Sequence, residues 1–131
     1  MKDLVIIGAG GFGREAVGLL WDCLDRKEYW LKGFLAHESV DLSSYGLGVP
    51  ILGDPESHQP DSEERFILAN GNVQVRRRVV EALKSRQAQF VSLIHPTATI
   101  FKSAELGEGA VVYPYATISN GASIKDFVHL S

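Results

Sequence analysis

The chain has 131 residues, of which 45% are hydrophobic and 22% charged, and its formal net charge is −3. This length suits one ordinary domain or two small ones, and the acidic balance argues against nucleic-acid or anionic-membrane surfaces. A single cysteine excludes an internal disulfide, and no apolar stretch is long enough for a signal sequence or a membrane span. We therefore expect a protein of the reducing cytoplasm.

A buried strand and a helix are predicted at the start of the chain. Leu4–Ile7 is continuously apolar, as in a strand that is covered on both faces. Apolar residues then recur four apart from Phe12 to Leu24, which predicts an amphipathic helix ending near Asp25.

A glycine-rich turn, G-A-G-G-F-G, joins this strand to this helix. In the pattern G-x-G-x-x-G, Gly8 permits the tight turn, Gly10 lets a phosphate approach the backbone, and Gly13 lets helix and strand pack closely. Gly11 leaves further space, and the helix N-terminus offers free N–H groups to an anion. The alternative is a glycine-rich turn with no ligand.

Three further elements follow before the second helix. Residues 30–35 predict a strand and 37–48 a polar loop. Residues 49–55 predict a short edge or turn element, because prolines are excluded from central strands. Residues 66–69 predict another buried strand, which Asn70-Gly71-Asn72 closes.

A second helix marked by Val75 to Leu83 and a strand at 90–93 complete an alternation that predicts a small parallel sheet covered by helices. Ligands of such sheets sit at the carboxyl ends of the strands, so the glycine turn, His37 with Glu38, and Asn70–Asn72 should share one edge. Glu38 is the only acid near the end of the second strand and comes slightly late, which weakens the case for a standard dinucleotide site.

The last part of the chain repeats every six residues. Seven aliphatic side chains stand six apart: Ile94, Ile100, Leu106, Val112, Ile118, Ile124 and Leu130. This period predicts a parallel β-solenoid in which Ile94 stacks under Val112 and Leu130, Ile100 under Ile118, and Leu106 under Ile124. Small residues, mostly alanines, follow four positions later, and Gly107, Gly109, Gly121 and Asn120 suit corners with positive φ.

The hexads start near a predicted domain boundary, which divides the chain into 1–92 and 93–131. Two coils are fewer than a solenoid normally needs, and the chain stops as a third one opens. We expect a fragment, or a domain capped by partner chains.

Taken together, the glycine turn, the stretch Leu93-Ile94-His95-Pro96-Thr97-Ala98 and the hexads resemble the sugar O-/N-acyltransferase family, typified by sialic acid O-acetyltransferase and UDP-4-amino-sugar acetyltransferases. The resemblance implies a small Rossmann-like α/β domain followed by the first two coils of a left-handed parallel β-helix. It also implies that the β-helices form a homotrimer, with acetyl-CoA as cofactor between neighbouring β-helices.

The resemblance implies that the first domain binds the nucleotide-sugar substrate. The residues that carry this expectation are Gly8, Gly10, Gly11, Phe12, Gly13, His37, Glu38, Asn70, Gly71, Asn72 and Arg76, the last three matching the family's G-N-x-x-x-R stretch. Paired acids that often end the second strand in the family are replaced here by Ala36 and His37.

The family's catalytic histidine would come about seven residues beyond Ser131, by its place in the hexad repeat. His129 stands in a different hexad slot. We therefore expect no catalytic residue and no metal site in this chain, and an acetyltransferase of bacterial surface-glycan synthesis as the parent protein. A non-catalytic nucleotide-sugar-binding or assembly module is the alternative, and an NAD(P)-binding domain is a third.

Overall fold

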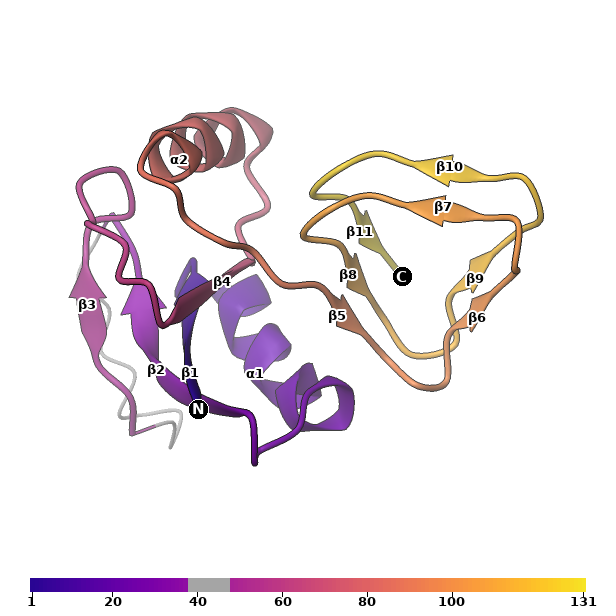
Figure 1. Ribbon diagram of the computed structural model, residues 1–131, viewed down its shortest axis with the longest axis horizontal. Helices are drawn as coiled ribbons and strands as arrows, with labels where there is room; N and C mark the ends of the chain where they lie inside the picture. The colour runs from indigo at the N-terminus through magenta and orange to yellow at the C-terminus, as the bar shows by residue number, and fades with distance from the viewer. Residues whose placement is uncertain (38–47) are drawn as a thin grey trace.

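The computed structural model describes residues 1–37 and 48–131, which form two parts lying side by side (Figure 1). The first is a parallel sheet with helices packed on it, and the second is a β-helix of short strands that follow a triangular path. Both parts of the predicted architecture are present. The division of the chain at 92/93 stays a prediction.

Four parallel strands form the sheet in the order β3-β2-β1-β4. They are Lys2–Ile7 (β1), Tyr29–Leu35 (β2), Ile51–Gly53 (β3) and Glu64–Leu68 (β4). The central place of β1 explains its continuous apolar run, because both of its faces are covered. The short strand β3 lies at the edge, where its flanking prolines interrupt no ladder.

Two helices, Gly11–Cys23 (α1) and Val73–Ser85 (α2), pack on opposite faces of this sheet. Leu4 and Ile6 of β1 share a core cluster with α1, whereas Val5 and Ile7 share one with α2. This alternation follows from the strand period of two. Since α1 follows β1 and α2 follows β4, each helix begins near the carboxyl ends of the strands. In the described part of the chain, neither helix is long and apolar enough to cross a membrane.

Seven two-residue strands form the β-helix. They are Leu93–Ile94 (β5), Thr99–Ile100 (β6), Glu105–Leu106 (β7), Val111–Val112 (β8), Thr117–Ile118 (β9), Ser123–Ile124 (β10) and His129–Leu130 (β11). The three faces hold the stacks β5-β8-β11, β6-β9 and β7-β10, all parallel. The register pairs Ile94 with Val112 and Ile100 with Ile118, so the predicted stacking of the hexads is confirmed.

From Gly109 onward, corners of the β-helix take positive φ at every sixth residue. Gly109 and Gly121 do so, as predicted, and so do Tyr115 (φ 63°) and Phe127 (φ 58°). The expectation of positive φ was wrong for Gly107 and Asn120. Gly107 is instead required for space, since a Cβ there would lie 2.6 Å from the backbone nitrogen of Asp126.

The predicted strand at 90–93 is not a single strand. Phe90 forms one isolated parallel bridge to Phe66 beside β4, while Leu93 belongs to β5 of the β-helix. The apolar run therefore crosses from one part to the other. Both of its ends are apolar because Phe90 packs in the core cluster of α2 and Leu93 in that of α1.

Candidate functional site at the carboxyl edge of the sheet

The turn between β1 and α1 depends on Gly8 and Gly13. Gly8 has φ 107°, and its N–H donates to the carbonyl oxygen of Leu35 at 2.8 Å. A Cβ on Gly8 would lie 2.6 Å from the carbonyl oxygen of Ala69, and a Cβ on Gly13 would collide with the carbonyl oxygen of Gly8. The tight turn and the close helix–strand packing predicted for these two glycines are confirmed.

Gly10 has a different environment, because a Cβ there would meet no atom within 4 Å. It is the N-cap of α1, no side chain caps the helix, and the first turn of the helix contains no acidic residue. The first N–H groups of α1 therefore keep their hydrogen-bonding capacity, and the helix end carries a partial positive charge of about half a unit. Such an end suits a phosphate or a carboxylate.

A cavity of about 360 Å³ opens over this helix end. It is bordered by the β1–α1 turn, the end of β2, Pro55, and the end of β4: Ile7, Gly8, Ala9, Gly10, Gly11, Phe12, Leu35, Ala36, His37, Pro55, Ala69, Asn70 and Gly71. The strand ends predicted to share one edge thus meet at one cavity, whose volume lies in the range of small-ligand sites.

Of the predicted site residues, seven border this cavity: Gly8, Gly10, Gly11, Phe12, His37, Asn70 and Gly71. Gly13, Asn72 and Arg76 do not, and Glu38 lies outside the described residues. The side chain of Asn72 accepts the N–H groups of Gln74 and Val75, both at 3.1 Å, so it caps α2. The binding roles of all these residues stay predictions.

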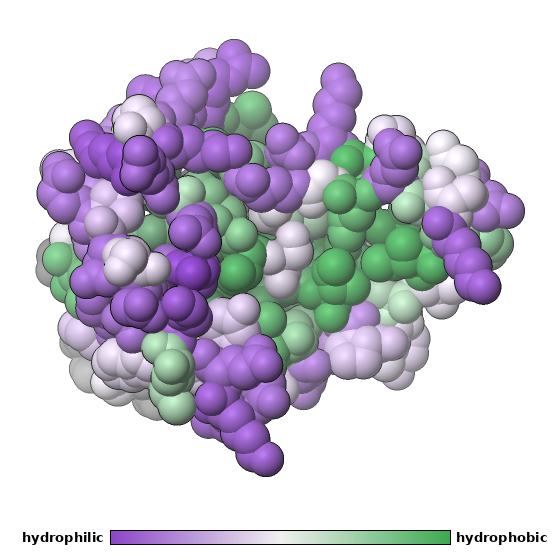
Figure 2. All heavy atoms as spheres, viewed as in Figure 1, coloured by the Kyte–Doolittle hydropathy of each residue, from purple (hydrophilic) through white to green (hydrophobic). Residues whose placement is uncertain are grey.

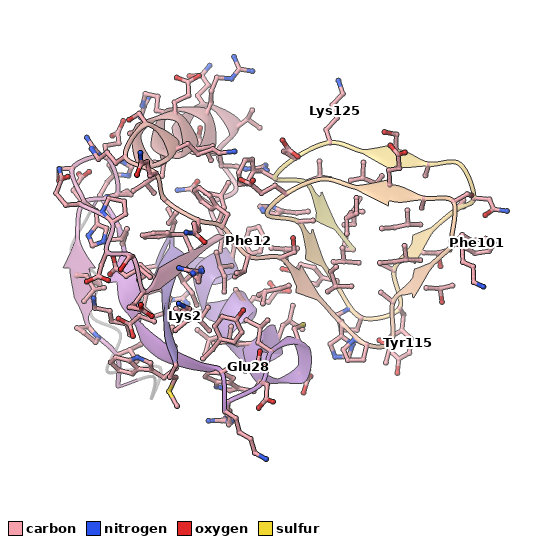
Figure 3. All side chains as sticks on the ribbon, viewed as in Figure 1. Lys2, Phe12, Glu28, Phe101, Tyr115 and Lys125 are labelled. Atoms are coloured by element: carbon pink, nitrogen blue, oxygen red, sulfur yellow. The ribbon has the colours of Figure 1, made fainter. Side chains whose placement is uncertain are left out.

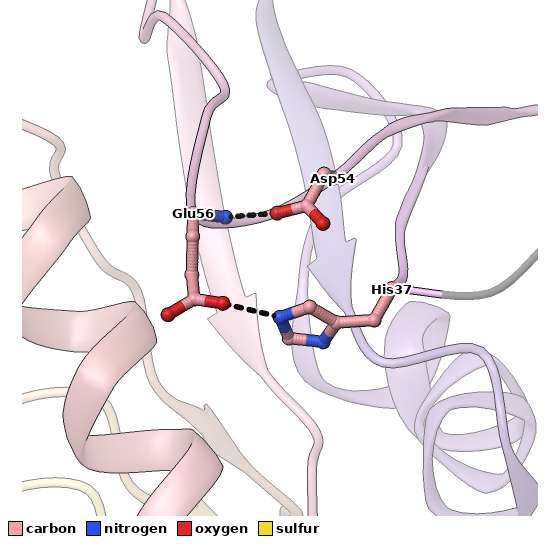
Figure 4. Close-up of side chains that lie close together, drawn as sticks. All are labelled: His37, Asp54 and Glu56. Carbon is pink, nitrogen blue, oxygen red and sulfur yellow. Dashed lines mark hydrogen bonds and ion pairs between the residues drawn. The ribbon is translucent and has the colours of Figure 1, made fainter.

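His37 at the cavity rim belongs to a polar cluster with Asp54 and Glu56 (Figure 4). Nε2 of His37 donates to the Glu56 carboxylate at 2.8 Å, and Arg78 contacts the other Glu56 oxygen at 3.3 Å. The hydrogen bond from His37, followed by the charge of Arg78, lowers the pKa of Glu56. The atoms of these three side chains that could bind a metal ion lie within 4.8 Å of one another, and the sequence did not predict this grouping. The hydrogen bonds within the cluster, including that from the N–H of Glu56 to Asp54, explain the grouping without a metal ion.

A second cavity, of about 610 Å³, lies between α2 and the β-helix. Arg76 and His129 border it, together with Val73, Val80 and Phe127. Nε2 of His129 donates to the carbonyl oxygen of Leu68 at 3.1 Å, and its ring meets Phe12 edge-on at 4.2 Å. Burial, and then the charge of Arg76, lower the pKa of His129 to about 4, so its imidazole is neutral at pH 7.

Sequence reasoning missed this second cavity and set His129 aside because its hexad slot does not match the family's catalytic histidine. One signal was present: the first residue of each two-residue strand points away from the prism when the aliphatic second residue points inward. His129 occupies such an outward position on the β5-β8-β11 face, which turns toward the α/β domain.

Comparisons with known proteins match this architecture. Residues 3–83 match the family model described as the PglD N-terminal domain. The chain is 36% identical over 120 residues to UDP-N-acetylbacillosamine N-acetyltransferase of Bacillus subtilis, covering 86% of this chain and 51% of that protein. It is 27% identical over 131 residues to GDP-perosamine N-acetyltransferase of Escherichia coli O157:H7, covering 95% and 57%. The chain thus spans little more than half the length of these relatives.

Solved structures superpose on nearly the whole chain. The acetyltransferase domain of PglB from Neisseria gonorrhoeae, in complex with acetyl coenzyme A, gives a TM-score of 0.78 at 29% identity, covering 98% of this chain and 60% of that one. A mutant perosamine N-acetyltransferase from Caulobacter crescentus, in complex with CoA and GDP-perosamine, gives 0.80 at 24% identity, covering 100% and 60%. Together these similarities confirm the predicted fold class.

Proposed function

The chain belongs to the PglD N-terminal domain family, and from that premise we propose that it is the nucleotide-sugar-binding part of an acetyl-CoA-dependent acetyltransferase. The acceptor is the amino group of a nucleotide-linked sugar, as the names of both curated relatives indicate for those proteins. The whole protein then acts in the cytoplasm during synthesis of bacterial surface glycans.

One observation carries this proposal: the uncapped N-terminus of α1 opens into a cavity of ligand size at the carboxyl edge of the sheet. A nucleotide places its phosphate against the N–H groups of Gly11–Gly13, where the helix charge favours an anion. Its nucleoside lies toward Ala36, His37 and Pro55 at the end of β2. Gly10 leaves the space that a phosphate needs.

Acetyl-CoA supplies the acyl group in this proposal, because relatives of the same fold were solved with acetyl-CoA or CoA. The residues described here fit the nucleotide-sugar part, and we assign none of them to the acyl donor. We also propose that the whole protein is a homotrimer through its β-helices, which expose Ile94, Ile100 and Phe101. Sedimentation of the whole protein tests this assembly, and a monomer would contradict it.

Thermal unfolding in the presence of nucleotides tests the binding site. UDP- and GDP-sugars at a hundred times their Kd should add about 2.7 kcal/mol to the free energy of unfolding. Gly10→Val should abolish this gain, because its side chain enters the cavity rather than the protein core.

Gly18→Val is the matched control, since Gly18 is exposed on α1, has equal room for a Cβ, and does not border the cavity. It should leave the ligand effect intact. Stabilisation by NAD(H) alone, or an unchanged nucleotide effect in Gly10→Val, would overturn the proposed function.

A further inference from the structure

One wall of the first cavity is a short turn, residues 54–58, which follows β3. Within it, the N–H of Glu56 donates to the Asp54 side chain at 2.7 Å. Pro55 of this turn is buried and borders the cavity, and the Glu56 carboxylate accepts the hydrogen bond from His37 at the cavity rim. Figure 2 shows mainly hydrophilic residues on this side of the molecule, over β3 and α2. The position of the turn therefore depends on polar contacts as well as on the packing of Pro55.

Arg86 holds the end of this turn from α2. It is the C-cap of α2, and its Nη1 donates to the carbonyl oxygen of Glu56 at 2.7 Å and lies 3.4 Å from that of His58. The turn is closed by the N–H of His58, which donates to the carbonyl oxygen of Asp54 at 3.1 Å, so the later carbonyls need donors from elsewhere. The guanidinium is half-buried and forms no ion pair within residues 1–37 and 48–131, and its acceptors there are these two carbonyls.

His58 holds the same turn from the sheet. Its Nε2 donates to Oε1 of Glu64 at 2.9 Å, and its ring meets Phe66 edge-on at 5.8 Å. Glu64 is the first residue of β4 and only 2% exposed, and it is fixed in turn by Lys32 and by the N–H of Asp61, both at 2.9 Å. The buried carboxylate thus gives His58 a rigid partner at the start of a sheet strand.

Neither Arg86 nor His58 borders the first cavity, yet both contact the turn that does. Under the proposed function the nucleoside lies against Pro55 and His37, whereas the phosphate lies at the N-terminus of α1. A shift of the turn would displace Pro55 and the hydrogen-bond partner of His37, but not the helix end. Binding groups need to be held within about 0.5 Å of their productive positions, so such a shift should cost affinity.

We propose that Arg86 and His58 are positioning residues of the nucleotide site, which hold residues 54–58 in place as the wall beside the nucleoside. They set the affinity for the nucleoside without touching it. This role rests on the proposed function, since it concerns the ligand of the first cavity.

Calorimetric titration with UMP, UDP, GMP and GDP tests the role of Arg86. Arg86→Gln should weaken all four nucleotides by about fivefold to tenfold, up to the value of one hydrogen bond to a charged group. The gain in affinity from mono- to diphosphate should change by less than about twofold, because the second phosphate lies away from the turn. Arg86→Lys keeps a charged donor and should bind within about threefold of the wild type.

Arg65→Gln is the matched control. Nη1 of Arg65 also donates to two carbonyl oxygens, those of Ser62 and Glu64, both at 2.9 Å, and neither residue borders the cavity or belongs to the turn. The variant should change nucleotide affinity by less than about twofold, even where urea unfolding shows a loss of stability. A role in stability alone would give Arg86→Gln this same result.

Two variants of His58 test the contact with the sheet. His58→Leu removes the hydrogen bond to Glu64, whose carboxylate keeps Lys32 and the N–H of Asp61. It should weaken UMP and GMP by about threefold or more. His58→Gln should bind them within about twofold of the wild type, because its amide can donate to the same carboxylate.

The outcomes separate the two proposals. If no nucleotide binds the wild-type chain, the proposed function and the positioning role both fail. If nucleotides bind, but Arg86→Gln weakens them no more than Arg65→Gln does or weakens only the diphosphates, the positioning role alone is overturned. If Arg86→Gln does not fold, the two His58 variants decide, and equal affinity in His58→Leu and His58→Gln overturns the positioning role.

Discussion

Three glycines of the β1–α1 turn have different physical environments. Gly8 adopts a left-handed backbone, Gly13 lies against the backbone of Gly8, and Gly10 faces open space. The first two are therefore needed for folding, whereas Gly10 borders the cavity and has room for a side chain. The shared sequence pattern hides this difference, which appears only when a Cβ is placed at each position.

Gly13→Ala should destabilise the protein by about 1–3 kcal/mol, because the added methyl group would force α1 away from β1. Gly10→Ala should cost no more than about 1 kcal/mol, the usual range at an N-cap. Urea unfolding of both variants measures the difference. Equal losses would mean that the turn tolerates a shift of α1.

His129 should make stability depend on pH in a defined window. Its folded-state pKa is about 4, against about 6.5 for an ordinary histidine, so the unfolded chain binds its proton at higher pH than the folded chain does. The free energy of unfolding should therefore fall as the pH is lowered from about 6.5 to about 4. Urea unfolding across this range measures the effect.

His129→Gln is the control for this dependence, because an amide can still donate to Leu68 but does not titrate. The variant should show a flatter profile between pH 6.5 and 4. The loss of stability that remains at lower pH belongs to acids such as Glu64. Burial alone would raise the pKa of Glu64, but hydrogen bonds from Lys32 and His58 lower it. A profile as steep as that of the wild type would rule out His129 as the cause.

The candidate site was partly predictable from the residues. Strand ends in a parallel sheet must meet at one edge, so the glycine turn, His37 and Asn70 could be grouped from their positions in the sequence. Arg76 could not be placed, because one helical turn separates it from Asn72 and carries it toward the β-helix. The capping role of Asn72 was missed because its spacing to α2 suits a cap and a ligand contact equally well.

At the scale of elements, the β-helix is held at its corners by side chains of the first coil. Oγ1 of Thr97 accepts the N–H of Tyr115 at 3.1 Å, and Oγ of Ser103 accepts the N–H of Gly121 at 2.8 Å. These bonds satisfy backbone donors at corners of the second coil where φ is positive. The corners therefore depend on the hydroxyl residues of one coil as much as on the glycines of the next.

Tyr115→Gly should raise the free energy of unfolding by about 0.5–1 kcal/mol. Tyr115 has φ 63° and is 83% exposed, so glycine removes backbone strain at the loss of little packing. Thermal unfolding of Tyr115→Gly and Tyr115→Ala measures the difference, since alanine keeps the strain. A gain for alanine as large as that for glycine would contradict the strain argument.

Among the elements, the hexads were predicted most fully, because a strict six-residue period leaves one way to stack. The strand expected at 90–93 was wrong for an equally physical reason. Phe90 packs on Phe66 and Phe127, while Leu93 packs beside α1, so one apolar run serves two cores. Hydrophobicity alone does not say which core a residue joins.

At the scale of the whole molecule, aromatic and polar contacts fix the α/β domain to the β-helix. Phe12 lies between the two parts and meets His129 and Tyr113 (Figure 3). Phe90 and Phe127 meet edge-on at 4.9 Å, and Lys84 pairs with Glu108 at 2.9 Å. Leu93 and Val111 of the β-helix also belong to the core cluster of β1 and α1, so the two parts share a core and should unfold together.

Phe90→Ala should lower the free energy of unfolding by about 2–3 kcal/mol and loosen this coupling. The two tryptophans, Trp21 and Trp30, both lie in the α/β domain, so their fluorescence reports that part alone. Circular dichroism reports both parts. The two signals should coincide in the wild-type chain and separate in the variant, and separate signals in the wild-type chain would contradict joint unfolding.

The regular stacking of the coils also fixes distances along the axis of the β-helix. Neighbouring parallel strands lie about 4.8 Å apart, so each complete turn of three hexads advances the β-helix by that distance along its axis. The contacts of Phe12 with His129 and of Phe90 with Phe127 fix the first turns of the β-helix relative to the first cavity. A change of one hexad would move a side chain to another face of the prism. Under the proposed function, the distance between the nucleotide and a group on the β-helix would therefore change in steps of about 4.8 Å.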